Sequence, residues 1–181
     1  TDDVAAILGG PLDVNCVLVA GGSLYAGTSG HGLLASPDRG LTWSVVLPGR
    51  SVVALAKDII DDTRIYASLD DAEGQSFVWR SLDGGRTWQT SHPIVGLGPI
   101  QPTLVQKKDK TLVAYMRDSG EPPHRVLLST SSDNGMTWSA SLFWPGFRKG
   151  SSRPPPRSIA LAARFFMTVR FIAGIRAGTG R

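Results

Sequence analysis

The chain has 181 residues, including 21 Gly and 12 Pro, and 41% of its residues are hydrophobic. This length is enough for one domain, and the many Gly and Pro residues favour short strands joined by turns. The single Cys16 excludes an intrachain disulfide and a CxxC metal site. Residues 1–147 carry a net charge of −4 and residues 148–181 carry +8, so we expect no nucleic-acid partner for the larger part.

Short runs rich in Val, Ile, Leu, Thr and Tyr, bounded by Gly, Pro, Asp and Ser, predict three groups of four strands. The first group covers residues 14–20, 23–27, 32–36 and 42–47. The second group covers residues 52–59, 64–69, 77–81 and 87–94. The third group covers residues 100–106, 111–116, 125–130 and 137–143. Residues 1–144 show no sustained 3.6-residue apolar periodicity, so we expect no helix there.

An eight-residue pattern, S-x-D-x-G-x-T-W, follows the third predicted strand of each group, and we call each copy a box. The boxes span residues 36–43, 81–88 and 131–138, and their Trp residues are 45 and 50 positions apart. That period suits one propeller blade of roughly 40–50 residues.

Within a box, we expect the Asp to close a hairpin turn by accepting backbone N–H groups, and the Gly to supply a positive φ. Thr and Trp are expected to begin the next strand. A catalytic acid is needed once, whereas these Asp residues recur in every group, so we interpret the boxes as structural. The structural residues are Ser36, Asp38, Gly40, Thr42, Trp43, Ser81, Asp83, Gly85, Thr87, Trp88, Ser131, Asp133, Gly135, Thr137 and Trp138.

The boxes resemble the Asp-box, or bacterial neuraminidase repeat, of the sialidase superfamily and of related non-catalytic β-propellers. In residues 99–105, 112–120 and 126–138 the third group also resembles the predicted-neuraminidase branch. The resemblance implies an all-β fold: a partial sialidase-like β-propeller over residues 1–147, followed by a basic tail over 148–181. Its three four-stranded antiparallel blades would cover about 14–47, 52–95 and 100–144. It also implies a carbohydrate ligand, an extracellular or periplasmic location and no cofactor.

In an up-and-down sheet, the boxes and the loops after the second strands lie at opposite ends. Those loops, 28–31, 70–76 and 117–124, share their end with the inter-blade links 48–51 and 91–99. Propeller ligands commonly bind at such an end. The candidate substrate-binding residues there are Arg117, Gln101, Asp70, Asp71 and Glu121, and the candidate catalytic residue is Asp118.

The chemistry of these candidates leaves alternatives open. Arg117 offers a fork that matches a carboxylate, and Asp118 could act as an acid if burial raised its pKa, but both could instead form a local salt bridge. Asp70, Asp71 and Glu73 could supply the paired carboxylates of a glycosidase or be merely solvated. The His residues are scattered without metal-ligand spacing, so we expect no metal site. Tyr25, Tyr66 and Tyr115 are expected to be packing residues at equivalent blade positions.

Two functions follow. The first is a piece of a retaining sialidase-type glycoside hydrolase that acts on a terminal acidic sugar, with Arg117 clamping the carboxylate and Asp118 nearby. We expect this piece to be inactive alone, because the Tyr–Glu pair of sialidases has no positions here. The alternative is a non-catalytic propeller that binds a protein or glycan through loops 70–76 and 117–124.

The repeat pattern stops after Trp138, and residues 148–181 are acid-free and rich in Arg. We hypothesise a shifted reading frame near residue 142. The alternatives are a basic amphipathic helix on a membrane surface and a disordered tail. A degraded gene product without function is a third interpretation of the chain, beside the two functions above. Three blades would also leave open sides with apolar faces and strand edges, through which the chain could self-associate.

Overall fold

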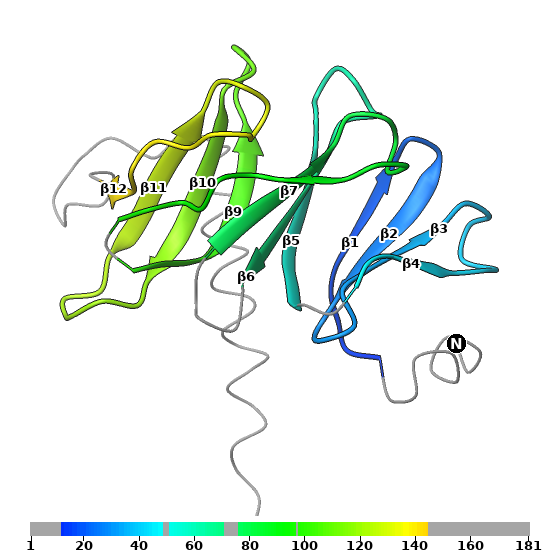
Figure 1. Ribbon diagram of the computed structural model, residues 1–181, viewed down its shortest axis with the longest axis horizontal. Coiled ribbons are helices and arrows are strands. Elements are labelled where there is room, and N and C mark those ends of the chain that lie inside the picture. Colours follow the sequence, from blue (N-terminus) through cyan, green and yellow to red (C-terminus); the bar gives the residue numbers. More distant parts are fainter. Residues whose placement is uncertain (1–11, 49–50, 71–75, 97, 145–181) are drawn as a thin grey trace, which may run out of the picture. The chain divides into compact units, whose positions relative to one another are not determined.

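The computed structural model describes residues 12–48, 51–70, 76–96 and 98–144, which form three four-stranded antiparallel sheets and no helix (Figure 1). The predicted all-β fold class is therefore confirmed, whereas the predicted tail over 148–181 lies outside the described residues. Blade one comprises β1 (Val14–Ala20), β2 (Ser23–Thr28), β3 (Leu33–Ser36) and β4 (Ser44–Leu47). Blade two comprises β5 (Ser51–Lys57), β6 (Ile65–Asp70), β7 (Ser76–Ser81) and β8 (Gln89–Thr90). Blade three comprises β9 (Pro99–Gln106), β10 (Leu112–Asp118), β11 (Val126–Ser131) and β12 (Leu142–Phe143).

The fourth strands begin later than predicted. The expected strand over 87–94 is only β8, and the expected strand over 137–143 is only β12. The reason is the box itself, because the Thr87 amide and hydroxyl both donate to Asp83, at 2.9 and 2.6 Å. Thr and Trp therefore remain in the turn rather than starting the strand.

The described residues contain no helix of the length and apolarity needed to cross a membrane.

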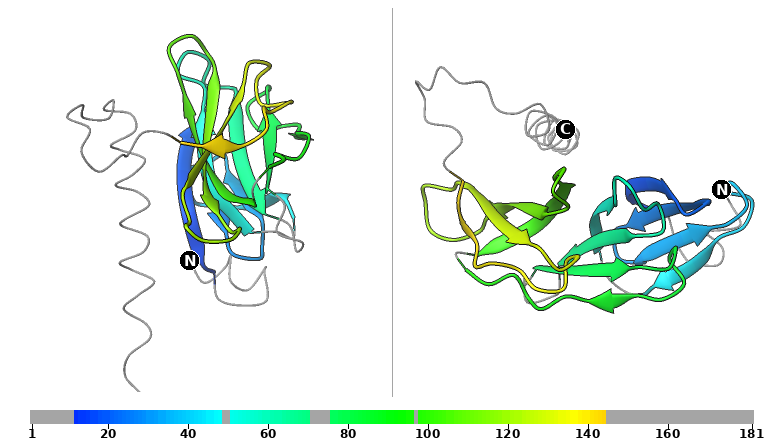
Figure 2. Two further views of the ribbon diagram at one scale, coloured as in Figure 1. Left: turned by 90° about the vertical axis from the view of Figure 1, so that its left-hand side faces the viewer. Right: turned by 90° about the horizontal axis from the view of Figure 1, so that it is seen from above.

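Each blade packs on the next through alternate residues of its second strand. Ile65, Ala67 and Leu69 of β6 form one buried cluster with Tyr25 and other residues of blade one. The intervening Tyr66 belongs to the next cluster, with Leu112, Ala114 and Met116 of β10. This follows from the two-residue period of a strand, which sends neighbouring side chains to opposite faces. Figure 2 shows the sheets following one another in chain order, with β1, β5 and β9 in contact in series.

The strand register corrects the expected equivalence of the three Tyr residues. Tyr25 and Tyr66 each follow the residue that pairs with the box Ser, namely Leu24 and Ile65. In blade three it is Leu112 that pairs with Ser131, so Val113 holds the equivalent position. Tyr115 stands one pleat further along β10, in the register position of Ser68 and Gly27.

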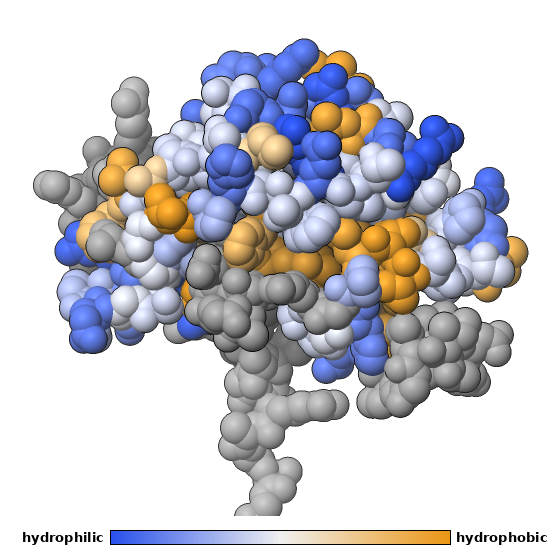
Figure 3. Space-filling view, in the orientation of Figure 1, coloured by the Kyte–Doolittle hydropathy of each residue, from blue (hydrophilic) through white to orange (hydrophobic). Residues whose placement is uncertain are grey.

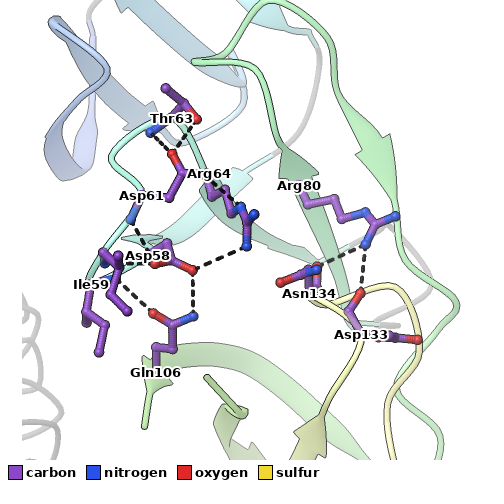
Figure 4. Close-up of polar contacts among 10 residues, drawn as sticks. Asp58, Ile59, Asp61, Thr63, Arg64, Arg80, Gln106, Asp133 and Asn134 are labelled. Atoms are coloured by element: carbon purple, nitrogen blue, oxygen red, sulfur yellow. Dashed lines mark hydrogen bonds and ion pairs between the residues drawn. The ribbon is translucent and has the colours of Figure 1, made fainter. Parts of the chain in front are cut away.

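The two equivalent Tyr residues differ in their hydroxyl groups. The Tyr25 hydroxyl donates to the Gly84 carbonyl in the box of blade two, at 2.9 Å. The corresponding carbonyl in blade three, that of Asn134, instead accepts from the Arg80 guanidinium at 3.2 Å, which also donates to the Asp133 carbonyl (Figure 4). The buried Tyr66 hydroxyl has no hydrogen-bond partner among the described residues.

This difference makes a paired prediction. Tyr25→Phe should lower the free energy of unfolding by about 1 kcal/mol, because it leaves the Gly84 carbonyl without its donor. Tyr66→Phe should leave stability unchanged or raise it, because the hydroxyl that it removes is buried without a partner. Urea unfolding of both variants measures this, and equal losses would contradict the assignment of the two hydroxyl groups.

Candidate functional site

The three boxes share one set of hydrogen bonds. In each box the Ser hydroxyl donates to the Asp carboxylate at 2.8 Å, and the Gly amide donates to the Ser hydroxyl at 2.7–2.9 Å. The Thr hydroxyl donates to the other carboxylate oxygen at 2.5–2.6 Å, and the Trp indole donates to the Gly carbonyl at 3.1–3.2 Å. Both oxygens of each carboxylate thus accept hydrogen bonds from within the same box and stabilise its turn.

These bonds also set the acidity of the box carboxyls. The hydroxyl and amide of Thr42 lower the pKa of Asp38 to about 2, and those of Thr87 do the same for Asp83. For Asp133, burial raises the pKa, but hydrogen bonds led by the Thr137 hydroxyl outweigh this effect and bring the pKa to about 2. A general acid works best with a pKa near the working pH, so the box carboxyls are poor acid catalysts.

At the end of each blade opposite the boxes, the innermost strand contains a register shift. The shifts fall between Val14 and Cys16 in β1 and between Val52 and Ala54 in β5. In β9 the shift lies at Gln101 and Pro102, opposite Met116. Such bulges re-aim side chains and occur often beside functional sites, and all three lie at the end where the sequence predicted a ligand.

Two of the predicted residues meet at the bulge of blade three. Gln101 has a φ of 55°, a left-handed conformation that is uncommon for a residue other than Gly. Its side-chain carbonyl accepts a hydrogen bond from Nη1 of Arg117 at 2.9 Å. Arg117 itself is exposed. The bulge therefore presents an amide and a guanidinium, joined to each other, at the mouth of the blade.

The side chain of Asp118 does not lie on the same face of β10 as the side chain of Arg117. Arg117 follows Met116, which packs towards blade two, and so shares the opposite face of β10 with Tyr115. Asp118 returns to the face of Met116, is 8% exposed, and accepts the Gly120 amide at 2.9 Å. The side chains of Arg117 and Asp118 therefore lie on opposite faces of β10, because adjacent strand residues diverge.

The other candidates are only partly described. Asp70 is the last residue of β6, and it pairs with Ser51 as Arg117 pairs with Ile100, so Asp70 and Arg117 hold equivalent register positions. Asp71 and Glu73 lie outside the described residues. Glu121 is exposed in the loop between β10 and β11. The structure thus brings together Gln101 and Arg117 and separates both from the side chain of Asp118.

A polar cluster between blades two and three was not predicted from the sequence. Asp58 is 3% exposed and accepts the Ile60 and Asp61 amides at 2.8 and 3.0 Å. The Gln106 amide group donates to Asp58 at 2.8 Å and accepts from the Ile59 amide (Figure 4). The sequence signal was an Asp at a strand end before a turn. Its partner Gln106 is 48 residues away, so no local pattern connects the two residues.

The comparisons with known proteins agree with this architecture. The profile of a family described as BNR repeat-like domain matches residues 17–163. The chain is also 30% identical over 182 residues to Xyloglucanase Xgh74A of Acetivibrio thermocellus, an alignment that covers 81% of this chain. The chain spans about a fifth, 20%, of the length of that relative.

Among solved structures, an α-L-arabinofuranosidase of Fusarium graminearum in complex with an iminosugar inhibitor aligns with a TM-score of 0.55 and 16% identity. The alignment covers 73% of this chain and 48% of that chain. At this identity the likeness concerns the fold, which it confirms as propeller-type. An ancestral GH74 enzyme aligns with a TM-score of 0.40 and 15% identity over 71% of this chain and 25% of that chain.

Proposed function

The chain belongs to the BNR repeat-like domain family, and from this premise we propose that it forms the sugar-binding part of a glycoside hydrolase-type propeller. The proposed binding surface is the end of the blades that carries the bulges, not the end that carries the boxes. Xyloglucanase Xgh74A and the arabinofuranosidase support a carbohydrate ligand, because both of these similar proteins are named for action on sugar polymers or glycosides.

The observation that carries the proposal is the Gln101–Arg117 pair. The positive φ of Gln101 is a strained conformation, and such strain persists where the surrounding structure supports a function. The pair offers the planar amide and guanidinium groups that recognise sugar hydroxyls and carboxylates by paired hydrogen bonds. The bond to Gln101 also restricts the Arg117 side chain, so less conformational entropy is lost when a ligand binds.

For the class of sugar, we propose a terminal acidic sugar of the sialic acid type. Only Nη1 of the exposed Arg117 guanidinium donates to Gln101, so its other N–H donors can reach a ligand. A guanidinium fork matches a carboxylate better than any neutral group. In this proposal Arg117 contacts the sugar carboxylate and Gln101 contacts a neighbouring hydroxyl.

A second candidate is a neutral ligand, such as a xyloglucan or arabinose-containing oligosaccharide. The names of the similar proteins favour it. The guanidinium and amide then bind adjacent hydroxyl groups, and Arg117 contributes hydrogen bonds without a charge partner. The two candidates differ in their dependence on salt, since only the acidic sugar forms an ion pair that added salt screens.

Binding measurements on the 181-residue chain test the proposal. Titration calorimetry with sialyllactose, a xyloglucan heptasaccharide and an arabino-oligosaccharide should give saturable binding of one class. Arg117→Ala should weaken the binding of an acidic sugar about tenfold, through loss of a charge-assisted hydrogen bond of about 1.5 kcal/mol.

The matched control is Arg125→Ala. Arg125 is also an exposed Arg of blade three, but its guanidinium lies over the Phe143 ring, 4.9 Å from the centroid, rather than beside Gln101. This variant should bind as the unchanged chain does. Equal losses in both variants, or no binding of any of the three sugars, would count against the proposed surface.

A further inference from the structure

The chain contains the same blade-to-blade contact twice. Blade one presents Tyr25 to the box of blade two, where the ring meets Trp88 edge-on at 6.4 Å and lies directly against Gly85. Blade two presents Tyr66 in the same way to Gly135 in the box of blade three. Each contact joins the trailing face of one blade, the face towards the following blade, to the leading face of the next.

Blade one has an apolar leading face with no blade before it among the described residues. Val17 and Val19 pair with Ala26 and Leu24, so all four share the face of β2 opposite Tyr25. Val17 is 63% exposed and Val19 is 59% exposed. Leu41 of the first box is 84% exposed, although it holds the box position of Met136.

Met136 shows what that position does inside the chain. Its backbone carbonyl accepts a hydrogen bond from the His92 amide of blade two, at 3.0 Å. The residue directly after the box Asp–x–Gly core thus lies at a blade-to-blade contact in blade three. Leu41 offers the same position, with an apolar side chain that is more exposed than that of Met136, to a blade that would precede blade one.

Blade three has the complementary trailing face. Tyr115, Leu128 and Leu142 lie in register across β10, β11 and β12, on the face away from blade two. Leu142 is 66% exposed, and Val126 beside Arg117 is 41% exposed. Figure 3 shows apolar side chains gathered over the region of β11 and β12 at the left of the molecule.

An indole already lies on this trailing face. Trp144 meets Tyr115 edge-on, with ring centroids 6.0 Å apart and an interplanar angle of 84°. In the Trp88–Tyr25 pair between blades one and two, the ring centroids are 6.4 Å apart and the interplanar angle is 74°. Trp144 therefore meets Tyr115 in an edge-on geometry similar to the one in which the box residue Trp88 meets Tyr25 of the blade before it.

From these two faces we propose that a second copy of this chain binds head to tail, its blade one packing on blade three of the first copy. The contact continues the series already formed by blades one, two and three, with the box of the second copy placed over Val113, which holds the register position of Tyr25 and Tyr66, and beside Tyr115. Trp144 must move aside to admit Trp43 of that box.

The symmetry of this contact makes a specific claim. It joins two different faces, so it is heterologous, and copies joined in this way form either a closed ring or an open filament. Two copies bring six blades, within the range of roughly four to eight in typical propellers. Closure buries the exposed apolar side chains of the two faces, which are those of Val17, Val19, Leu41, Val126 and Leu142.

Sedimentation velocity of the 181-residue chain over a wide range of concentrations tests the proposal. The unchanged chain should form dimers. Val19→Glu on the leading face and Leu142→Glu on the trailing face should each raise the dissociation constant more than about a hundredfold, because each places an unpaired charge in the contact. Leu82→Glu is the matched control, since Leu82 is 45% exposed but lies in the box of blade two, on neither face.

A mixture separates this arrangement from any other dimer. Val19→Glu keeps an intact trailing face and Leu142→Glu keeps an intact leading face, so mixing the two variants should produce mixed dimers although neither dimerises alone. Thermal melts by circular dichroism verify that each variant is folded. A chain that stays monomeric at every concentration, dimers that survive both variants, or a mixture without mixed dimers would overturn the proposal.

Discussion

Gly85→Ala is expected to lower the free energy of unfolding by about 3 kcal/mol, from overpacking of about 1–3 kcal/mol and a left-handed backbone of about 1–2 kcal/mol. Gly85 has a φ of 81°, and a methyl group there would overlap the phenol ring of Tyr25. The ring cannot easily withdraw, because its hydroxyl is bonded to Gly84 and its edge meets Trp88. Urea unfolding at neutral pH measures the loss.

The neighbouring Gly84 separates the two causes. Its φ is 72°, but an added methyl group would meet nothing within 4 Å. Gly84→Ala should therefore lose only the backbone part, about 1 kcal/mol. If both variants lose the same amount, the close approach of blade one to the second box does not contribute to stability as the structure indicates.

The boxes could be predicted from the sequence because every bond within them is local. Ser, Asp, Gly, Thr and Trp all lie within eight residues, and each bond joins residues at most four positions apart. The spacing of the boxes then gave the number of blades and the strand order. Even here, the start of the fourth strand was wrong, because the two bonds from Thr87 to Asp83 hold the Thr in the turn.

Features that depend on register could not be predicted. Tyr115 looks equivalent to Tyr25 and Tyr66 by its place within a strand-like run, yet the pairing of Leu112 with Ser131 shifts it by one pleat. That pairing depends on how β10 and β11 meet across a loop, which no local pattern specifies. The bulge at Gln101 is likewise visible only once β9 and β10 are paired.

The candidate site includes one feature that the sequence predicted and one that it did not. The expectation that the loops after the second strands gather with the inter-blade links is consistent with the antiparallel topology, and Gln101 and Arg117 do meet. The side chains of Arg117 and Asp118 lie on opposite faces of β10, for a reason already present in the sequence. Once residues 111–116 were predicted to be a strand, continuing its two-residue period would have placed 117 and 118 on opposite faces.

Asp58→Ala is expected to lower the free energy of unfolding by about 3 kcal/mol, because it leaves three donors of partly buried hydrogen bonds without their charged acceptor. The donors are the Ile60 amide, the Asp61 amide and the side-chain amide of Gln106, which connects blade two to blade three. Asp62→Ala is the control. Its carboxylate is about half exposed, bonded to the Gly21 amide and paired with Lys57, and exposed ion pairs contribute less than about 1 kcal/mol.

The difference between the unchanged chain and Asp58→Ala should also depend on pH. Burial raises the pKa of Asp58, but the Gln106 side chain, the Asp61 and Ile60 amides and the Arg64 charge together bring it below the ordinary value of 3.8. A carboxyl with a lowered pKa stabilises the fold fully above its ordinary value and loses this contribution as the pH falls through the folded value. Urea midpoints measured from neutral to acid pH should therefore converge for the two proteins below about pH 4. A difference that stays constant with pH would mean that Asp58 acts by packing, and not as the ionised acceptor that joins the two blades.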